Sequence, residues 1–181
     1  ILGVELTATP QIQKGSRKVD FKNVVYEYSL AHALNDEQFV KVPVVFTRKD
    51  FRPEEYTLEQ LDHEKLNDGV RIHEETKSHL EIYSRTYGKQ LVKPFVLVVA
   101  KDTDHSREIR EYLTSNEFFC GYYKDKVLEI NSAQRGAEKD ENIEQLLSLE
   151  KPDNKIEIVI HVNMLKEGWD VTNLYTIVPL R

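Results

Sequence analysis

The segment from Ile156 to Arg181, IEIVIHVNMLKEGWDVTNLYTIVPLR, limits the choice of fold more than any other part of the chain. Two apolar runs rich in β-branched residues, Ile156–Val162 and Leu174–Val178, flank a polar turn. Such short runs are typical of strands that are buried on both faces of a parallel sheet. The turn contains Gly168 and Asp170 and follows the carboxyl end of the first strand, where open parallel sheets place ligand-binding residues. The segment therefore predicts a strand, a ligand site and a second strand.

The preceding part of the chain alternates strands with helices in the same way. Apolar runs predict strands at Phe95–Ala100 and Val127–Ile130. Asp102, Thr103 or Asp104 is expected to cap a helix after the first of them, and Glu141–Leu149 is predicted to form another helix. We therefore expect an α/β fold with a mostly parallel sheet and helices on both faces.

Residues 57–88 carry helix signals at both ends. Thr57 and Gln60 form a capping-box pattern, which predicts a helix through about Asp68. Gly69 is expected to break it, and Val70–Tyr87 is predicted to form a second, amphipathic helix that Gly88 ends.

The amino-terminal part is expected to be less regular. Polar Gln11–Asp20 predicts a loop or hinge, and Ser29–Glu37 predicts a short helix. Phe21–Tyr28 and Phe39–Thr47 have the composition of strands, although Pro43 favours an edge position for the second.

Composition narrows the functional classes. The formal net charge of -6 does not fit a protein with a broad nucleic-acid-binding surface, because phosphate contacts need clustered Lys and Arg, but it permits one basic groove. One cysteine, Cys120, excludes an intrachain disulfide framework and fits a reducing cytoplasm. Six histidines with this single cysteine give no zinc-site spacing. No apolar run approaches the roughly 20 residues that span a bilayer, so we expect no membrane partner.

Several segments resemble motifs of the superfamily 2 helicases and translocases. VNMLKEGWDV followed by YTIVPLR resembles motif V, in the version typical of the restriction subunit of type III restriction enzymes. LTATP at Leu6–Pro10 resembles motif III, and FVLVVAKDTDHSREIREYL at Phe95–Leu113 resembles motif IV. Val24–Pro43 is similar to the segment that crosses between the two motor lobes, whereas residues 44–93 match no motif.

This resemblance implies a domain organisation and a set of partners. Residues 1–17 would be the tail of the first motor lobe with a hinge, and residues 18–181 would be the second RecA-like lobe of a P-loop NTPase fold, truncated before motif VI. ATP and Mg²⁺ would be cofactors of the parent protein, with neither expected on the fragment. Expected partners are DNA, the first motor lobe and, as a further candidate, a modification methyltransferase subunit.

The resemblance also assigns roles to single residues. Gly168 and Asp170 match positions that face the nucleotide, and Thr7 and Thr9 match positions that couple nucleotide state to DNA binding. Contacts to the DNA backbone are implied for Lys101, Thr103, Asn163 and Lys166. The alternatives are that residues 102–104 only cap a helix, that Lys166 contacts only solvent and that Trp169 is a core residue. Val162 departs from the pattern, since many relatives have threonine there.

We accordingly expect a fragment of an ATP-dependent DNA translocase that contributes half of the ATP cleft and a groove for the DNA backbone. The sequence contains no G-x-x-x-x-G-K-[ST] loop, so no ATP hydrolysis is expected from this chain alone. The alternatives are a lobe of a helicase with another effector domain, or an interaction module that has the fold without the motor.

Overall fold

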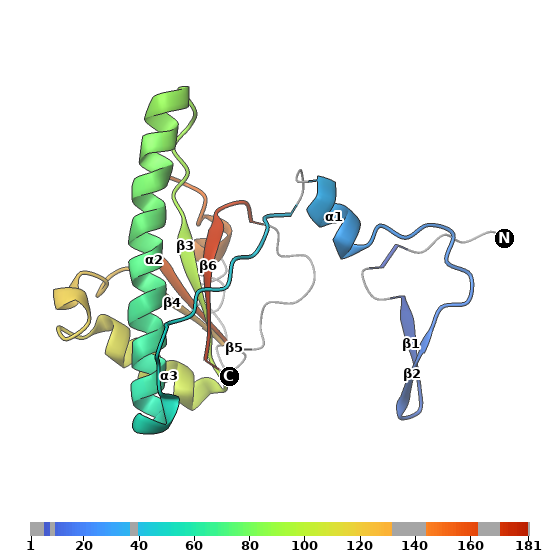
Figure 1. The fold of residues 1–181 in the computed structure, drawn as a ribbon, viewed down its shortest axis with the longest axis horizontal. Helices are drawn as coiled ribbons and strands as arrows, with labels where there is room; N and C mark the ends of the chain where they lie inside the picture. The colour runs from blue at the N-terminus through green and yellow to red at the C-terminus, as the bar shows by residue number, and fades with distance from the viewer. Residues whose placement is uncertain (1–5, 8–9, 37–39, 132–143, 163–170, 181) are drawn as a thin grey trace. The chain divides into compact units, whose positions relative to one another are not determined.

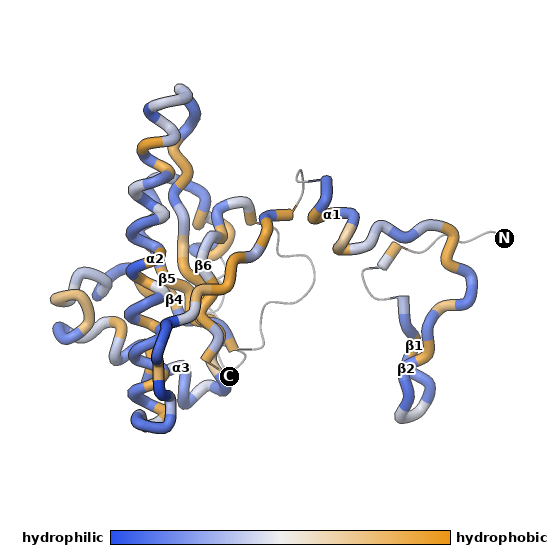
Figure 2. Tube along the Cα trace, in the orientation of Figure 1, coloured by the Kyte–Doolittle hydropathy of each residue, from blue (hydrophilic) through white to orange (hydrophobic). Residues whose placement is uncertain are grey.

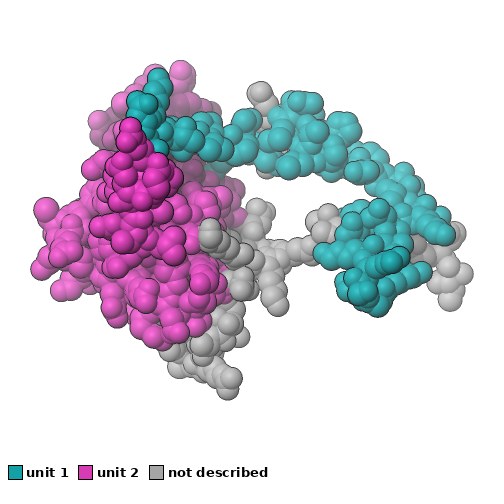
Figure 3. Space-filling view, turned by 60° about the horizontal axis from the view of Figure 1, so that its bottom comes forward, with its two compact units in different colours: residues 1–51 teal, residues 52–181 magenta. Residues whose placement is uncertain are grey.

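The computed structural model describes residues 6–7, 10–36, 40–131, 144–162 and 171–180. The chain divides into two compact units, residues 1–51 and 52–181 (Figure 3). Residues 17 and 18, between which the sequence predicts a boundary of the motor lobes, both lie in a β-hairpin, and that boundary stays a prediction.

The second unit contains a four-stranded, all-parallel sheet (Figure 1). The strand order is β4-β5-β3-β6, and every neighbouring pair is parallel. The prediction of an α/β fold with a mostly parallel sheet is confirmed, and all four expected strands are present within two residues of their predicted bounds: β3 (Phe95–Val99), β4 (Val127–Asn131), β5 (Ile158–Val162) and β6 (Leu174–Pro179).

Each face of the sheet has its own apolar core. The first core lies between the sheet and two helices, α2 (Leu58–Tyr87) and α3 (Thr103–Thr114); it includes Leu66, Val70, Ile109 and Leu113 from the helices. The second core lies on the opposite face, where residues 144–147 are helical and Leu146 and Leu149 pack on Phe95 and Val159. Helices on both faces explain why β5 is buried at every position.

One continuous helix, α2, replaces the two helices predicted for residues 57–88. The capping box is confirmed, since Thr57 and Gln60 exchange side-chain hydrogen bonds with each other's backbone N–H groups. Gly88 ends the helix in the left-handed conformation, as expected. The predicted break at Gly69 is wrong: this glycine is buried within the helix, where its lack of a side chain lets α2 approach Val178 of β6.

The first unit has little core of its own. The predicted loop at Gln11–Asp20 is wrong, because β1 (Gln11–Lys14) and β2 (Arg17–Asp20) form an antiparallel hairpin that turns at Gly15 with φ of 63°. The predicted helix is confirmed as α1 (Leu30–Asp36), whose Ala33 is the one buried residue among those described in this unit.

The strands predicted for the rest of this unit are not formed in its described residues. Residues 21–28 and 40–47 contain no strand. They are largely exposed, and Figure 2 draws much of residues 40–46 as hydrophobic. A segment with the composition of a strand forms one only where it can pack against a partner. Within the described part of this unit the only strand pairing is that of β1 with β2, so these segments have no partner strand there.

None of the described helices combines the length and the apolar character that crossing a membrane requires.

Gly69→Ala provides a test of the packing between α2 and β6. A methyl group at this position would lie 2.3 Å from Cγ2 of Val178, so we expect the free energy of unfolding to fall by about 1 to 3 kcal/mol. Helix propensity alone predicts the opposite sign, a gain of about 1 kcal/mol. Urea unfolding of Gly69→Ala, Val178→Ala and the double variant measures the coupling. The double variant should be more stable than the sum of the single effects predicts, and a stabilised Gly69→Ala would contradict the close approach.

Candidate functional site

The carboxyl edge of the sheet, where its parallel strands end, brings together two of the segments singled out in the sequence. β3 and β5 are direct neighbours, and the backbone N–H of Ala100 donates to the carbonyl oxygen of His161 at 3.0 Å. Lys101 therefore follows β3 beside the point where β5 ends at Val162.

The chain leaves this edge after β3 on the face of the first core. It enters α3 there, which contributes Ile109 and Leu113 to that core. Open parallel sheets bind ligands outside the carboxyl ends of their strands, so this edge is where a ligand site is expected.

Asp102 caps α3 at this edge. Its carboxylate accepts a hydrogen bond of 2.9 Å from the backbone N–H of His105, and this bond holds the pKa of Asp102 below its ordinary value. Thr103 is the first helical residue and is half-buried, and the side chain of Lys101 is exposed. Capping thus accounts for Asp102, while DNA contacts of Lys101 and Thr103 remain predictions.

His105 links the loop at Lys101 to α2, a role that the sequence did not predict. Its Nδ1 accepts from the backbone N–H of Lys101 at 3.3 Å, so Nε2 carries the proton and donates to Asp62 at 3.1 Å. Asp62 and His105 are 43 residues apart, and no local pattern connects them.

The roles that the sequence assigned to other residues stay predictions. Thr7 is exposed. Thr9, Asn163, Lys166, Gly168, Asp170 and Trp169 lie outside the described residues.

The amino edge of the sheet, where the strands begin, carries a buried charge cluster that the sequence did not predict. Glu157 immediately precedes β5, and its carboxylate accepts from Lys126 Nζ at 2.6 Å and from Lys77 Nζ at 2.8 Å. Nε2 of His73, which is fully buried, lies 3.4 Å from the same carboxylate. Lys77 also contacts Glu74, which accepts a hydrogen bond from the hydroxyl of Tyr123.

The contacts in this cluster shift the pKa values of its members. Burial alone would raise the pKa of Glu157, but hydrogen bonds from His73, Lys126 and Lys77 outweigh it and hold the pKa well below its ordinary value. For Lys77, burial opposes protonation, and the bonds to Glu157 and Glu74 raise its pKa. Glu157 is therefore ionised and Lys77 is charged at neutral pH.

His73, Glu74 and Glu157 could also supply three ligands to a cation, because their potential ligand atoms lie within 4.8 Å of one another. Two ammonium groups already occupy the carboxylate of Glu157 and would have to leave before a metal could bind. The group is therefore an ion-pair cluster that joins α2 to the starts of β4 and β5.

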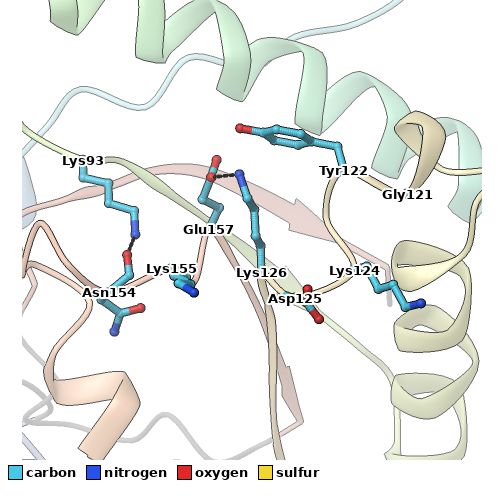
Figure 4. Close-up of a pocket in the computed structure, with 9 residues that line it drawn as sticks. All are labelled: Lys93, Gly121, Tyr122, Lys124, Asp125, Lys126, Asn154, Lys155 and Glu157. Carbon is cyan, nitrogen blue, oxygen red and sulfur yellow. Dashed lines mark hydrogen bonds and ion pairs between the residues drawn. The ribbon is translucent and has the colours of Figure 1, made fainter.

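A pocket of about 360 Å³ opens beside this cluster (Figure 4). Lysines from three segments line it, with Lys93 before β3, Lys124 and Lys126 before β4, and Lys155 before β5. Burial lowers the pKa of Lys93; attraction to Glu157 opposes this shift, and repulsion from Lys126 and Lys77 adds to it.

Comparison of the chain with protein families, with curated proteins and with solved structures gives no match. The all-parallel sheet with flanking helices is consistent with a RecA-like α/β fold. Any assignment of function therefore depends on the residues and the geometry described above.

Glu157→Gln tests whether the charge cluster stabilises the second unit. The substitution leaves two ammonium groups without their shared carboxylate, so we expect the free energy of unfolding at neutral pH to fall by about 2 to 3 kcal/mol. The side chains of Lys77 and Lys126 are 26% and 23% exposed, which keeps the loss below that of a fully buried pair.

The difference in stability between the wild type and Glu157→Gln should depend on pH. Because Glu157 has a lower pKa when folded than its ordinary value of 4.5, its stabilisation is complete above that value and is lost as the pH falls below it. The stability difference between the wild type and Glu157→Gln should therefore shrink on acidification below about pH 4.5. Glu108→Gln, at an exposed position of α3, is the control and should stay within about 0.5 kcal/mol of the wild type. A difference that does not change with pH would refute the assigned ionisation.

Proposed function

We propose that this chain forms the second RecA-like lobe of an ATP-dependent DNA translocase, with the restriction subunit of a type III restriction enzyme as the specific parent. In this function the lobe contributes half of the ATP cleft and part of a groove for the DNA backbone. One observation carries the proposal: β3 and β5, the strands of the segments that resemble motifs IV and V, are parallel neighbours. Both segments therefore leave the sheet at one edge.

The start of α3 has groups that suit a DNA phosphate. The ammonium of Lys101 and the hydroxyl of Thr103 lie at a helix amino terminus, where the helix dipole favours an anion. The bond from the Lys101 N–H to His105, which Asp62 holds in turn, fixes the backbone of this loop against α2. Contacts of this kind position a strand without selecting its sequence.

Charge limits the expected affinity. Asp102 and Asp104 flank Thr103, and the chain has a net charge of -6, so only a few phosphates are expected to be engaged. Asn163 and Lys166 would add contacts from the segment after β5. The lobe should bind DNA weakly by itself and more tightly together with the first motor lobe.

ATP and Mg²⁺ would bind between the two lobes, with Gly168 and Asp170 facing the nucleotide from this side. Thr7 and Thr9 would couple that site to the DNA groove. A modification methyltransferase subunit would be a further partner of the parent protein. The single cysteine fits a DNA motor that acts in the reducing cytoplasm.

The salt dependence of DNA binding tests this proposal on the purified chain. If two or three phosphates are engaged, the logarithm of the association constant should fall with the logarithm of the salt concentration at a slope of about -2 to -3. Lys101→Ala should bind more weakly and should reduce the magnitude of this slope by about 1. Fluorescence anisotropy of labelled oligonucleotides of different sequence gives the slope and shows whether any base is preferred.

Lys89→Ala is the matched control, because Lys89 is also exposed but follows the carboxyl terminus of α2, close in sequence to the start of β3. It should bind as the wild type does. Equal effects of the two substitutions, or a strong preference for one oligonucleotide sequence, would refute a backbone groove at Lys101.

A further inference from the structure

The pocket at the amino edge has more positive than negative charge around it. Four lysines, Lys93, Lys124, Lys126 and Lys155, line it together with two carboxylates, those of Asp125 and Glu157. Both oxygens of Glu157 and one of Glu74 already accept from lysine ammonium groups. The excess of positive charge is local, since the whole chain is acidic.

The remaining lysines are available for a ligand. Among the described residues, Lys93, Lys124 and Lys155 have no carboxylate within ion-pair distance, and the ammonium of Lys93 donates only to the backbone carbonyl of Asn154. In Figure 4, Lys93 and Lys126 approach the space beside Glu157 from opposite sides, while Lys124 points away from it. Of the lining lysines that have no carboxylate partner among the described residues, Lys93 and Lys155 are therefore left to contact a ligand.

The kind of cation indicates the kind of anion. Planar carboxylates are matched best by the paired N–H groups of arginine, and no arginine lines this pocket. Separate ammonium groups that converge from different strands suit a tetrahedral anion, which accepts hydrogen bonds in several directions. A pocket of about 360 Å³ also lies within the size range of small-molecule sites.

We propose that this pocket binds a phosphate group, either as inorganic phosphate or on a small phosphate monoester, with Lys93 and Lys155 as its main contacts. Burial, followed by repulsion from Lys126 and Lys77, lowers the pKa of Lys93, and a bound anion would favour its charged form. The site lies at the sheet edge opposite to Lys101 and does not depend on the DNA-binding proposal.

Isothermal titration calorimetry of the purified chain tests this site at constant ionic strength, with inorganic phosphate and with ribose 5-phosphate as probes. Wild type should bind at least one of the two saturably. Lys93→Met should weaken that binding about tenfold, since it removes a charged hydrogen-bond donor. Lys155→Met alters an exposed side chain without risk to the core and should weaken binding by about threefold. Lys89→Met is the control and should leave binding unchanged.

A short single-stranded oligonucleotide, titrated into the same variants, separates this site from the DNA groove. If the proposal holds, Lys93→Met and Lys155→Met bind the oligonucleotide as the wild type does. The proposal would be overturned if the wild type bound neither inorganic phosphate nor ribose 5-phosphate saturably. An equal loss in Lys89→Met would also overturn it, as would a loss of oligonucleotide binding in Lys93→Met without a loss of phosphate binding, which would assign these lysines to DNA. Circular dichroism of each variant confirms that it is folded.

Discussion

The carboxylate of Glu157 is the interaction on which the arrangement of the second unit depends. It lies almost fully buried between α2 and the sheet, where an unpaired charge would be strongly unfavourable. Lys77 from α2 and Lys126 from the start of β4 neutralise it, and the backbone of Glu157 bonds to Lys126 and Val96. One charged residue thereby joins a helix to three strands. The apolar cores supply the driving force for folding, while this cluster and the close approach of Gly69 to Val178 hold α2 on the sheet.

That arrangement gives the two edges of the sheet different chemistry. At the amino edge, lysines outnumber carboxylates around a pocket, so a small anion is the natural ligand. At the carboxyl edge, β3 and β5 end side by side, and the start of α3 presents Lys101 and Thr103. Under the proposed function the second edge serves DNA and nucleotide, which leaves the first for a separate ligand. The long helix α2 contacts both edges, through Asp62 at one and through His73 and Lys77 at the other.

The strands and helix caps could be predicted from the sequence because local residues determine them. Short β-branched runs sufficed for β3 and β5, and Thr57, Gln60 and Gly88 marked the ends of α2. The reason for a glycine inside α2 could not be predicted, since Gly69 packs against Val178, more than a hundred residues away. The hairpin β1–β2 was missed because its side chains are nearly all exposed and show no apolar alternation. Lys77 and Glu157 are 80 residues apart, so no local pattern could reveal their ion pair.

Mapping the DNA-binding surface by NMR tests the central claim, that the carboxyl edge of the sheet holds the DNA backbone. The backbone amide signals of the isotope-labelled chain are recorded during a titration with a short oligonucleotide. The account predicts that the largest shifts cluster at Lys101–His105 and in the segment that follows Val162, with the amino-edge residues Lys93, Lys126 and Lys155 little changed. Shifts centred on the amino edge, or on the hairpin β1–β2 alone, would contradict the assignment of this lobe to a DNA motor.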